Sequence, residues 1–314
     1  MTEAVLTVRF AGPLVSVQDG GRPGLMRYGV PCSGAMDRRS LAAANTALGN
    51  PSGAAAVEVS LGGLVIECRA GEVSFAVAGG GFIVEHGGTR RGSWHVATLR
   101  QGERLAIRPG PWGSWCYLAV AGQLQAARWL GSASTHALSG FGGGRLAAGT
   151  VLTVTGAHVI DGGAIPCPVS ARPRPVARVT LGPQARFFGD EARAAFLTGP
   201  WRMTEAWDRM GVRLSGPPIA PEGPLDMPSE AVARGSVQVA GDGVPSILLA
   251  DHQTTGGYPK IATVLDCDLD ALVQLRPRDR VMFQPVSAGQ AVDLARSAAL
   301  ADRRYLAALT VARG

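Results

Sequence analysis

The sequence predicts a mainly β protein with a few helices, and three observations support this fold class. Glycine, at 43 of 314 residues, is about twice as frequent as in an average protein. These glycines separate short segments in which apolar and polar residues alternate, the pattern of half-buried strands. Gly241-Asp242-Gly243 lies between two such segments, and Asp-Gly readily supplies the positive φ angles of a hairpin turn. We therefore expect many strands joined by tight turns.

The individual elements follow from local patterns. Strands are expected at residues 6–10, 64–68, 105–108, 115–120, 178–181, 236–239 and 246–249. Helices are expected at residues 37–48, at residues 190–197, and from 287 to about 310. The last of these begins with Ser287 and Gln290, which form a capping box. We expect this terminal helix to pack on the strands that precede it.

A proline-rich stretch divides the chain. Residues 165–176 contain four prolines among small and basic residues, which is typical of a linker between lobes. The prediction is an N-terminal β-barrel-like lobe at 1–164 and a C-terminal lobe at 177–314 that carries residues 251–260 and the terminal helix. Each half opens with a strand followed by a short helix, which indicates two related lobes. A single continuous domain is the alternative.

Composition excludes several classes of function. No apolar run approaches the roughly 18 residues of a membrane span, and the first residues lack a secretory pattern, so a cytoplasmic protein without membrane contact is expected. The formal charge of +6 comes from scattered residues without a basic run, and it supports no binding of nucleic acid. The histidines and the five cysteines lack metal-ligand spacing, so no metal site is predicted.

The basic residues are unusual in kind. Lysine and arginine total 30, and Lys260 is the single lysine. An ammonium is a compact point charge whose pKa shifts more readily than that of a guanidinium, so a lone lysine in an arginine-rich chain is a candidate functional residue.

Lys260 ends a dense polar segment that follows a strongly apolar strand. The segment offers a base, hydroxyls, an amide, a phenol and an ammonium on flexible backbone, in the order Asp251, His252, Gln253, Thr254, Thr255, Gly256, Gly257, Tyr258, Pro259 and Lys260. Polar residues that emerge at a strand end suit a catalytic or binding site. The alternative is a decorated loop in which Asp251 caps the turn and Lys260 faces water.

A second dense segment lies near the N-terminus. It contains Gln18, Asp19 and Arg22, and continues through Ser33 to Asp37 at the start of the first predicted helix. A carboxylate or phosphate could bind there, because a helix N-terminus offers unpaired N–H groups to an anion. The alternative is structural: Asp37 caps its own helix and Arg22 pairs with Asp19.

Other motifs predict less. The glycine-rich stretches at residues 79–81 and 140–145 match neither a P-loop nor a dinucleotide fingerprint, and turns explain them better. Ser33 and Ser139 do not lie in a nucleophile elbow.

The two polar segments and several shorter motifs resemble one known family over nearly the whole chain. It is the biotin-dependent carboxyltransferase-like family of the 5-oxoprolinase C subunit, also called allophanate hydrolase subunit 2 or urea amidolyase-related protein. The matching motifs lie at residues 18–24, 33–37, 44–45, 48–51, 208–211, 229–230, 235–238 and 251–260.

This resemblance implies a cyclophilin-like β-barrel architecture and an enzyme that works as one part of a complex. The chain would be the C subunit of an ATP-dependent 5-oxoprolinase, which opens 5-oxoproline to glutamate together with its smaller B component and its A component. One alternative is a carboxyltransferase that gives allophanate from urea, with biotin carried by a partner. Another is a non-enzymatic regulator that binds an inhibitor of a sensor kinase.

The resemblance also implies roles for the polar residues. Lys260 would be the cation beside the reacting group, with Arg22 second, and His252 or Asp19 would manage protons. Tyr258, Gln253 and Thr254 would hold an amide or ureido group. The remaining candidates for substrate binding are Gln18, Ser33, Asp37 and Thr255.

Cofactors are expected only at the level of the complex. ATP has no motif in this chain, and Lys260 lies in Tyr-Pro-Lys-Ile rather than between methionines, so the chain itself is not expected to carry biotin. The isolated chain should be inactive.

Overall fold

The chain forms two compact units in a computed structural model that describes residues 2–222 and 227–311. Unit 1 comprises residues 1–22, 33–172 and 302–314, and unit 2 comprises residues 23–32 and 173–301. The mainly β class is confirmed, since short strands outnumber the four α-helices of the described residues. None of the helices in that part of the chain combines the length and the apolar surface needed to span a bilayer.

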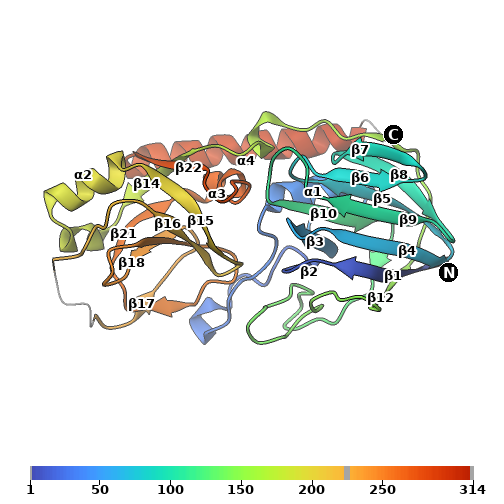
Figure 1. The fold of residues 1–314 in the computed structure, drawn as a ribbon, viewed down its shortest axis with the longest axis horizontal. Helices are drawn as coiled ribbons and strands as arrows, with labels where there is room; N and C mark the ends of the chain where they lie inside the picture. Colours follow the sequence, from blue (N-terminus) through green and yellow to red (C-terminus); the bar gives the residue numbers. More distant parts are fainter. Residues whose placement is uncertain (1, 223–226, 312–314) are drawn as a thin grey trace. The chain divides into compact units, whose positions relative to one another are not determined.

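Unit 1 contains two sheets (Figure 1). The seven-stranded sheet has the order β11-β12-β1-β4-β9-β6-β7, and the six-stranded sheet has the order β13-β8-β5-β10-β3-β2. The strands are β1 (Glu3–Ala11), β2 (Ser16–Gln18), β3 (Ala56–Ser60), β4 (Leu64–Ala70), β5 (Glu72–Ala78), β6 (Ile83–His86), β7 (Thr89–Gly92), β8 (His95–Arg100), β9 (Arg104–Arg108), β10 (Trp115–Val120), β11 (Gln123–Leu124), β12 (Val151–Thr155) and β13 (Gly163–Ala164).

Both sheets and helix α1 (Arg38–Thr46) share one apolar core. The core includes Leu6, Leu41, Ile66, Phe75 and Leu118. Helix α1 packs on β5 and β10, and a 3-10 turn, η2 (Val169–Ala171), precedes the division of the chain. Burial of the alternating apolar residues on β1 and β4 is what the sequence pattern predicts for half-buried strands.

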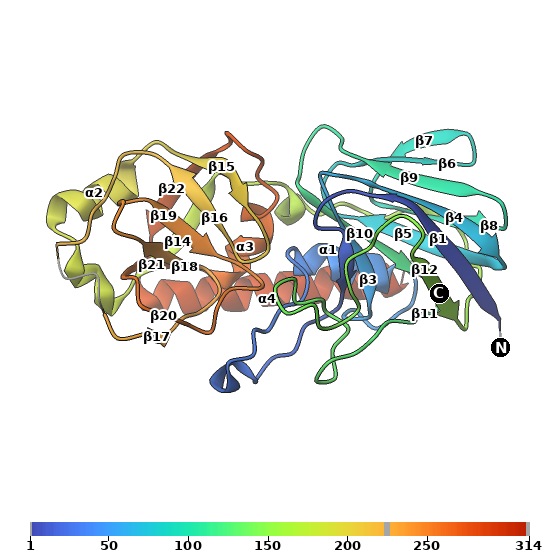
Figure 2. The same cartoon turned by 60° about the horizontal axis from the view of Figure 1, so that its bottom comes forward.

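Unit 2 is built on a closed barrel with the strand order β14-β21-β18-β19-β16-β15-β22 (Figure 2). Its strands are β14 (Val176–Leu181), β15 (Trp201–Trp207), β16 (Gly211–Ser215), β18 (Ser236–Val239), β19 (Pro245–Leu248), β21 (Lys260–Val264) and β22 (Arg280–Pro285), with the separate pair β17 (Glu230–Ala231) and β20 (Thr255–Gly256). Its helical segments are η1 (Met26–Tyr28), η3 (Pro183–Phe187), α2 (Asp190–Thr198) and α3 (Asp266–Leu272).

The barrel of unit 2 closes through its one parallel pair, β14 with β22, while its other neighbours are antiparallel. The predicted Asp-Gly hairpin is confirmed as β18 and β19, and Gly243 has φ +72°. Phe196 of α2 stacks on Phe283 of β22 with ring centroids 4.3 Å apart, which fixes that helix on the barrel.

Helix α4 (Ala288–Val311) corrects part of one prediction, because its residues up to Ala301 group with unit 2 and its last part groups with unit 1. Its start is as expected, because Ser287 and Gln290 exchange reciprocal hydrogen bonds as a capping box. Its one buried residue among those described, Leu309, lies in the core of unit 1 and not on the preceding strands. Asp302 pairs with Arg39 at 2.6 Å, and the Tyr305 hydroxyl donates to the Pro166 carbonyl. The apolar side chains at the end of α4 therefore pack against unit 1, which is formed by earlier residues of the chain.

Candidate functional site

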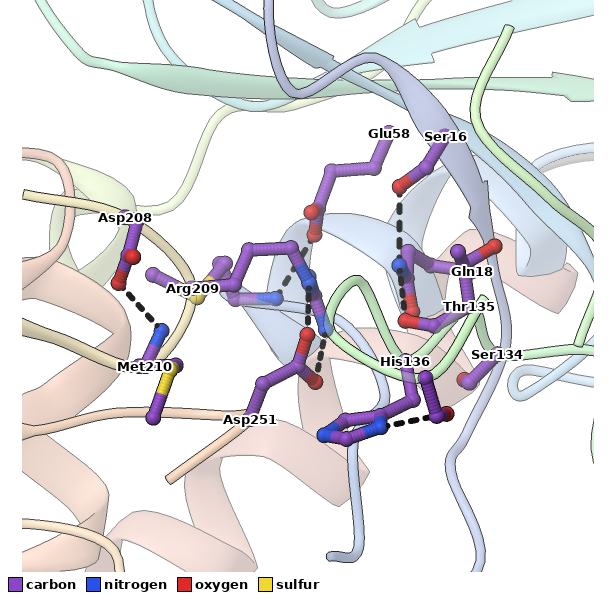
Figure 3. A network of polar contacts seen from close by, with 12 residues as sticks. Ser16, Gln18, Glu58, Ser134, Thr135, His136, Asp208, Arg209, Met210 and Asp251 are labelled. Carbon is purple, nitrogen blue, oxygen red and sulfur yellow. Dashed lines mark hydrogen bonds and ion pairs between the residues drawn. The ribbon is translucent and has the colours of Figure 1, made fainter. Parts of the chain in front are cut away.

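The segment from Asp251 to Lys260 is anchored at its first residue. Asp251 accepts two hydrogen bonds from Arg209, at 2.9 and 3.0 Å, and both side chains are buried (Figure 3). Such a bidentate pair is rigid, because the planar guanidinium matches the carboxylate. Beside it, Asp208 accepts hydrogen bonds from the N–H groups of Met210 and Gly211. The site segment thus starts from a fixed point in unit 2.

His252 lies next in the segment and is also buried. Burial lowers the pKa of His252 below the ordinary value of 6.5, since desolvation disfavours the imidazolium. Its Nδ1 lies 2.6 Å from the carbonyl oxygen of Gln253. A carbonyl only accepts, so Nδ1 carries the proton and Nε2 is the basic nitrogen.

Lys260, at the start of β21, does not face water, so that alternative is wrong. Its side chain is 15% exposed and its Nζ lies 3.6 Å from Glu230 Oε2. Nζ is buried and has no hydrogen-bond partner among the described residues. The backbone N–H of Lys260 donates to Gln184 Oε1 at 2.8 Å, and Gln184 Nε2 donates to Glu230 at 2.5 Å. One glutamine therefore positions both members of the ion pair.

A second buried donor lies on the neighbouring strand. Gln238 of β18 stands opposite Lys260 in the strand register. Its Oε1 accepts from Gln253 Nε2 at 3.0 Å, while its own Nε2 is buried without a partner. Since a buried donor without an acceptor costs about 1–3 kcal/mol, this arrangement is typical of a place where a ligand supplies the acceptor.

Gln253 also lines a pocket of about 450 Å³ in unit 2. The other polar residues of its wall are Glu205, Asp208, Arg213 and Ser246. The remaining predicted residues of this unit lie on the more open side of the segment: Thr254 is half-buried, Thr255 is exposed on β20, and Tyr258 is 51% exposed. In unit 2, His252 is hydrogen-bonded to the Gln253 carbonyl and Gln253 to Gln238, which pairs with Lys260 in the strand register.

The predicted residues of unit 1 form a separate network around Asp19. The Asp19 carboxylate accepts from the hydroxyls of Ser132 and Ser134 and from the N–H of Ala133, each at 2.6 Å, and from the N–H of Gly21 at 2.8 Å. Burial opposes ionisation of Asp19, but these hydrogen bonds together outweigh it and lower its pKa. Asp19 is therefore a charged group that ties distant loops together.

Gln18 and Arg22 flank this carboxylate and are also buried. Gln18 Nε2 donates to Ser16 Oγ at 2.9 Å and to the Thr135 carbonyl at 3.1 Å (Figure 3), while Gln18 Oε1 has no partner. The guanidinium of Arg22 donates to the Ser134 carbonyl and lies 4.8 Å from the centroid of the Trp129 ring. These contacts hold residues 18–22 in place, and they leave Gln18 Oε1 as an acceptor without a donor among the described residues.

Asp37 confirms the structural alternative for its position. Its side chain caps α1 by accepting from Ser40 N at 3.0 Å and from Ser40 Oγ at 2.6 Å. An incoming anion would have to compete with this carboxylate for the Ser40 N–H. Ser33 has φ +51° and a buried Oγ without a hydrogen-bond partner.

Three residues of the Lys260 region were missed among the predicted site residues: Gln184, Glu230 and Gln238. A sequence signal existed for Gln238, because it lies between two valines of a predicted strand, where a buried amide must find partners. Gln184 lies 76 positions from Lys260 in the chain, and no local pattern connects the two.

Together, the fold and the site define a mainly β protein whose barrel unit presents amide and ammonium groups at a strand end. The chain belongs to the family described as "carboxyltransferase domain, subdomain A and B", whose model matches residues 28–285. This confirms the family predicted from the motifs.

Three similar proteins illustrate the family. The C subunit of the Haemophilus influenzae 5-oxoprolinase is 36% identical over 90% of this chain and 91% of its own length. The crystal structure of TTHA0988 is 36% identical with a TM-score of 0.80, over 90% of this chain and 56% of that one. The Kluyveromyces lactis urea carboxylase is 28% identical with a TM-score of 0.86, over 97% of this chain and 29% of that one.

Proposed function

We propose that this chain is the C subunit of a multi-subunit, ATP-dependent 5-oxoprolinase that opens 5-oxoproline to glutamate. The observation that carries the proposal is the ammonium of Lys260, which is buried without a hydrogen-bond acceptor next to two glutamine amides. The C subunit of the Haemophilus influenzae 5-oxoprolinase matches over 91% of its length, so the likeness extends well beyond the site.

Lactam opening explains why such donors are needed. When water adds to the lactam carbonyl, negative charge develops on the carbonyl oxygen before the C–N bond breaks. A buried ammonium stabilises this charge more strongly than it would in water, because the local dielectric is low. We assign this role to Lys260, and we assign Gln253 and Thr254 to holding the amide, with Thr255 and Tyr258 at the more open side.

The proton-handling roles differ between the two candidates. His252 is neutral with a basic Nε2, which suits acceptance of a proton near neutral pH. Asp19 already accepts four hydrogen bonds and has a lowered pKa, which supports a positioning role. We assign four further residues of unit 1 to the binding surface that Asp19 holds in place: Gln18, Arg22, Ser33 and Asp37.

ATP is assigned to the complex and not to a site built by this chain. The two glycine-rich stretches lack the P-loop pattern. Each contains a glycine on which other residues pack closely: a Cβ on Gly81 would lie 2.3 Å from the Trp112 indole nitrogen, and one on Gly142 would lie 2.1 Å from the Ser134 carbonyl, which supports turn roles. Biotin, if used, would come on a partner, because the one lysine is buried in an ion pair. No cluster that could hold a metal occurs in the described ranges.

The proposal includes the smaller B component and the A component of the enzyme as partners, in the cytoplasm. A longer relative supports a partner, since this chain matches 56% of the TTHA0988 chain and leaves the rest of it without a counterpart. We also propose that the barrel is cyclophilin-like, and that the chain divides into related lobes at 1–164 and 177–314. The compact units support this division, and differ from it in residues 23–32 and 302–314.

Urea carboxylation is the second candidate, on the strength of the likeness to the Kluyveromyces lactis urea carboxylase. The same donors would then hold the ureido oxygen and the migrating carboxyl group. Regulation of a sensor kinase through its inhibitor, without catalysis, is a third. Expression with the B and A components, followed by assays for ATP-dependent loss of 5-oxoproline and for biotin-dependent carboxylation of urea, separates the three. We expect loss of 5-oxoproline by the complex and none by the chain alone.

Replacement of Lys260 tests the catalytic assignment. In the reconstituted complex, Lys260→Ala should lower kcat by more than about 100-fold, because the charge on the reacting oxygen loses its cation. Arg296→Ala is the matched control, since it removes one positive charge from an exposed position on α4 and should leave kcat unchanged. Turnover of Lys260→Ala equal to that of the wild type would overturn the role of Lys260.

A further inference from the structure

Two donors on adjacent strands of unit 2 point to one missing acceptor. Within the part of the chain that the structure describes, Lys260 Nζ and Gln238 Nε2 are both buried without hydrogen-bond partners, and their residues are paired in the β18–β21 register. The orientation of the Gln238 amide is fixed, since its Oε1 accepts from Gln253. The unpaired N–H groups are therefore held in place and do not result from a freely rotating side chain.

The β17–β20 pair covers these donors, and Figure 2 shows it next to β18 and β21. Glu230 of β17 pairs in register with Gly256 of β20. Gly256 packs directly on the donor, because a Cβ at this position would lie 2.5 Å from Gln238 Nε2. Glu230 places its carboxylate 3.6 Å from Lys260 Nζ. The two short strands thus place the Glu230 carboxylate next to Lys260 and the Gly256 backbone next to Gln238.

The Glu230 carboxylate holds Lys260 only loosely. A charge-assisted N–H···O bond is normally about 2.7–2.9 Å long, whereas this separation is 3.6 Å. Glu230 Oε2 also accepts from Gln184 Nε2 at 2.5 Å. Because the side chain of Glu230 is 57% exposed, a carboxylate that leaves Lys260 exchanges this hydrogen bond for contact with water. A ligand oxygen at normal hydrogen-bond distance would satisfy the ammonium better than Glu230 does.

We propose that Glu230 is a displaceable gate over Lys260, and that the carbonyl oxygen of the ligand takes its place with Lys260 Nζ and Gln238 Nε2 as donors. The identity of the ligand as 5-oxoproline rests on the proposed function. The gate itself rests on the contacts of Glu230, Gln238 and Lys260. Glu230 is a competitor of the substrate, and Gln238 is a residue that binds it.

In the reconstituted complex, replacement of Glu230 and replacement of Gln238 should change KM for 5-oxoproline in opposite directions. Glu230→Gln should lower KM for 5-oxoproline about two- to fivefold, because the competing charge is lost while the shape is kept. Gln238→Met should raise KM, because it removes the donor to the ligand, and should lower the melting temperature slightly, because Gln253 Nε2 loses its acceptor. Glu191→Gln, at an exposed acid on α2, is the matched control. A higher KM or lower kcat in Glu230→Gln would show that Glu230 merely positions Lys260, and would overturn the gate.

The single lysine gives a test that needs no turnover. Acetic anhydride labels the isolated chain at Lys260 and at the N-terminal amine, and peptide mass spectrometry separates the two. Glu230→Ala should raise the labelling rate of Lys260 several-fold relative to that amine, because Nζ becomes exposed. An unchanged rate would overturn the gate.

Protection by ligand completes the test and separates the two proposals. In the complex of the wild type with its partners, 5-oxoproline should slow the labelling of Lys260. If Glu230→Ala speeds labelling but 5-oxoproline gives neither protection nor turnover, the gate stands and the assignment as a 5-oxoprolinase fails. If 5-oxoproline is consumed while labelling is the same in the wild type and Glu230→Ala, the assignment stands and the gate fails.

Discussion

Asp19 in unit 1 and Lys260 in unit 2 are both charged groups removed from water, yet their surroundings differ. Asp19 receives four hydrogen bonds from its own unit, and its pKa is lowered. Lys260 has one carboxylate at 3.6 Å and no hydrogen bond to its ammonium. Charges that a fold needs are satisfied internally, whereas a charge kept for a ligand is left incompletely satisfied. The contrast therefore distinguishes a structural network from a binding site.

Removal of the Asp19 carboxylate should have the largest effect on stability. Asp19→Ala leaves two hydroxyls and two backbone N–H groups without their acceptor, so the free energy of unfolding should fall by about 3 kcal/mol. Urea denaturation measures this change. Asp161→Ala, at an exposed acid of the same unit, should change it by less than about 0.5 kcal/mol. A similar small change in Asp19→Ala would remove the distinction between the two regions.

Acid should weaken both units through buried histidines, namely His95 in unit 1 and His252 in unit 2. Burial lowers the pKa of His95 in unit 1 and of His252 in unit 2 below 6.5. The unfolded chain then binds more protons than the folded one, so stability is full above about pH 6.5 and falls below it, by at most about 1.4 kcal/mol per pH unit for each group. Melting temperatures from pH 7.5 to 5 should show a shallower slope in His252→Gln. The exposed His158, changed to Gln, should leave the slope as it is.

Removal of the Lys260 ammonium should have the smallest effect on stability, and of the opposite sign. Lys260→Met keeps the length of the side chain and removes a buried charge that lacks hydrogen bonds. The free energy of unfolding should stay equal or rise by up to about 1 kcal/mol, while activity is lost. Denaturation in urea checks the first part. A loss of more than about 2 kcal/mol would mean that Lys260 is as structural as Asp19.

The sequence was informative wherever neighbouring residues decide the structure. The Asp37 cap of α1, the Asp-Gly hairpin and the Ser287–Gln290 capping box are local devices, and each is confirmed. Helix α3 was not predicted, because its N-terminus lacks a side-chain cap. A tertiary contact holds it instead: Asp268 accepts hydrogen bonds from the backbone and side chain of Arg178.

The sequence suggested candidate site residues, but it did not indicate the contacts between them. Lys260 stood out by composition alone, and its segment could be placed at a strand end. The partners that define its environment come from η3, β17 and β18, far apart in the chain. Likewise, Asp19 reaches Ser132 across 113 positions. Such contacts depend on strand register and loop packing, which hydrophobic periodicity does not encode.

Unit 1 is assembled from three stretches of chain, so it cannot complete its core until residues from 302 onward have been made. Its core includes Leu309, and Arg39 finds Asp302 only after most of unit 2 has been made. Because proteins are made from the N-terminus, the early part of unit 1 must wait on the ribosome, with apolar surface uncovered, until its closing segment emerges. The barrel of unit 2 waits too, since β14 pairs with β22 only after residues 280–285 have been made. Both units are therefore completed late, and the nascent chain is the form of this protein most exposed to aggregation.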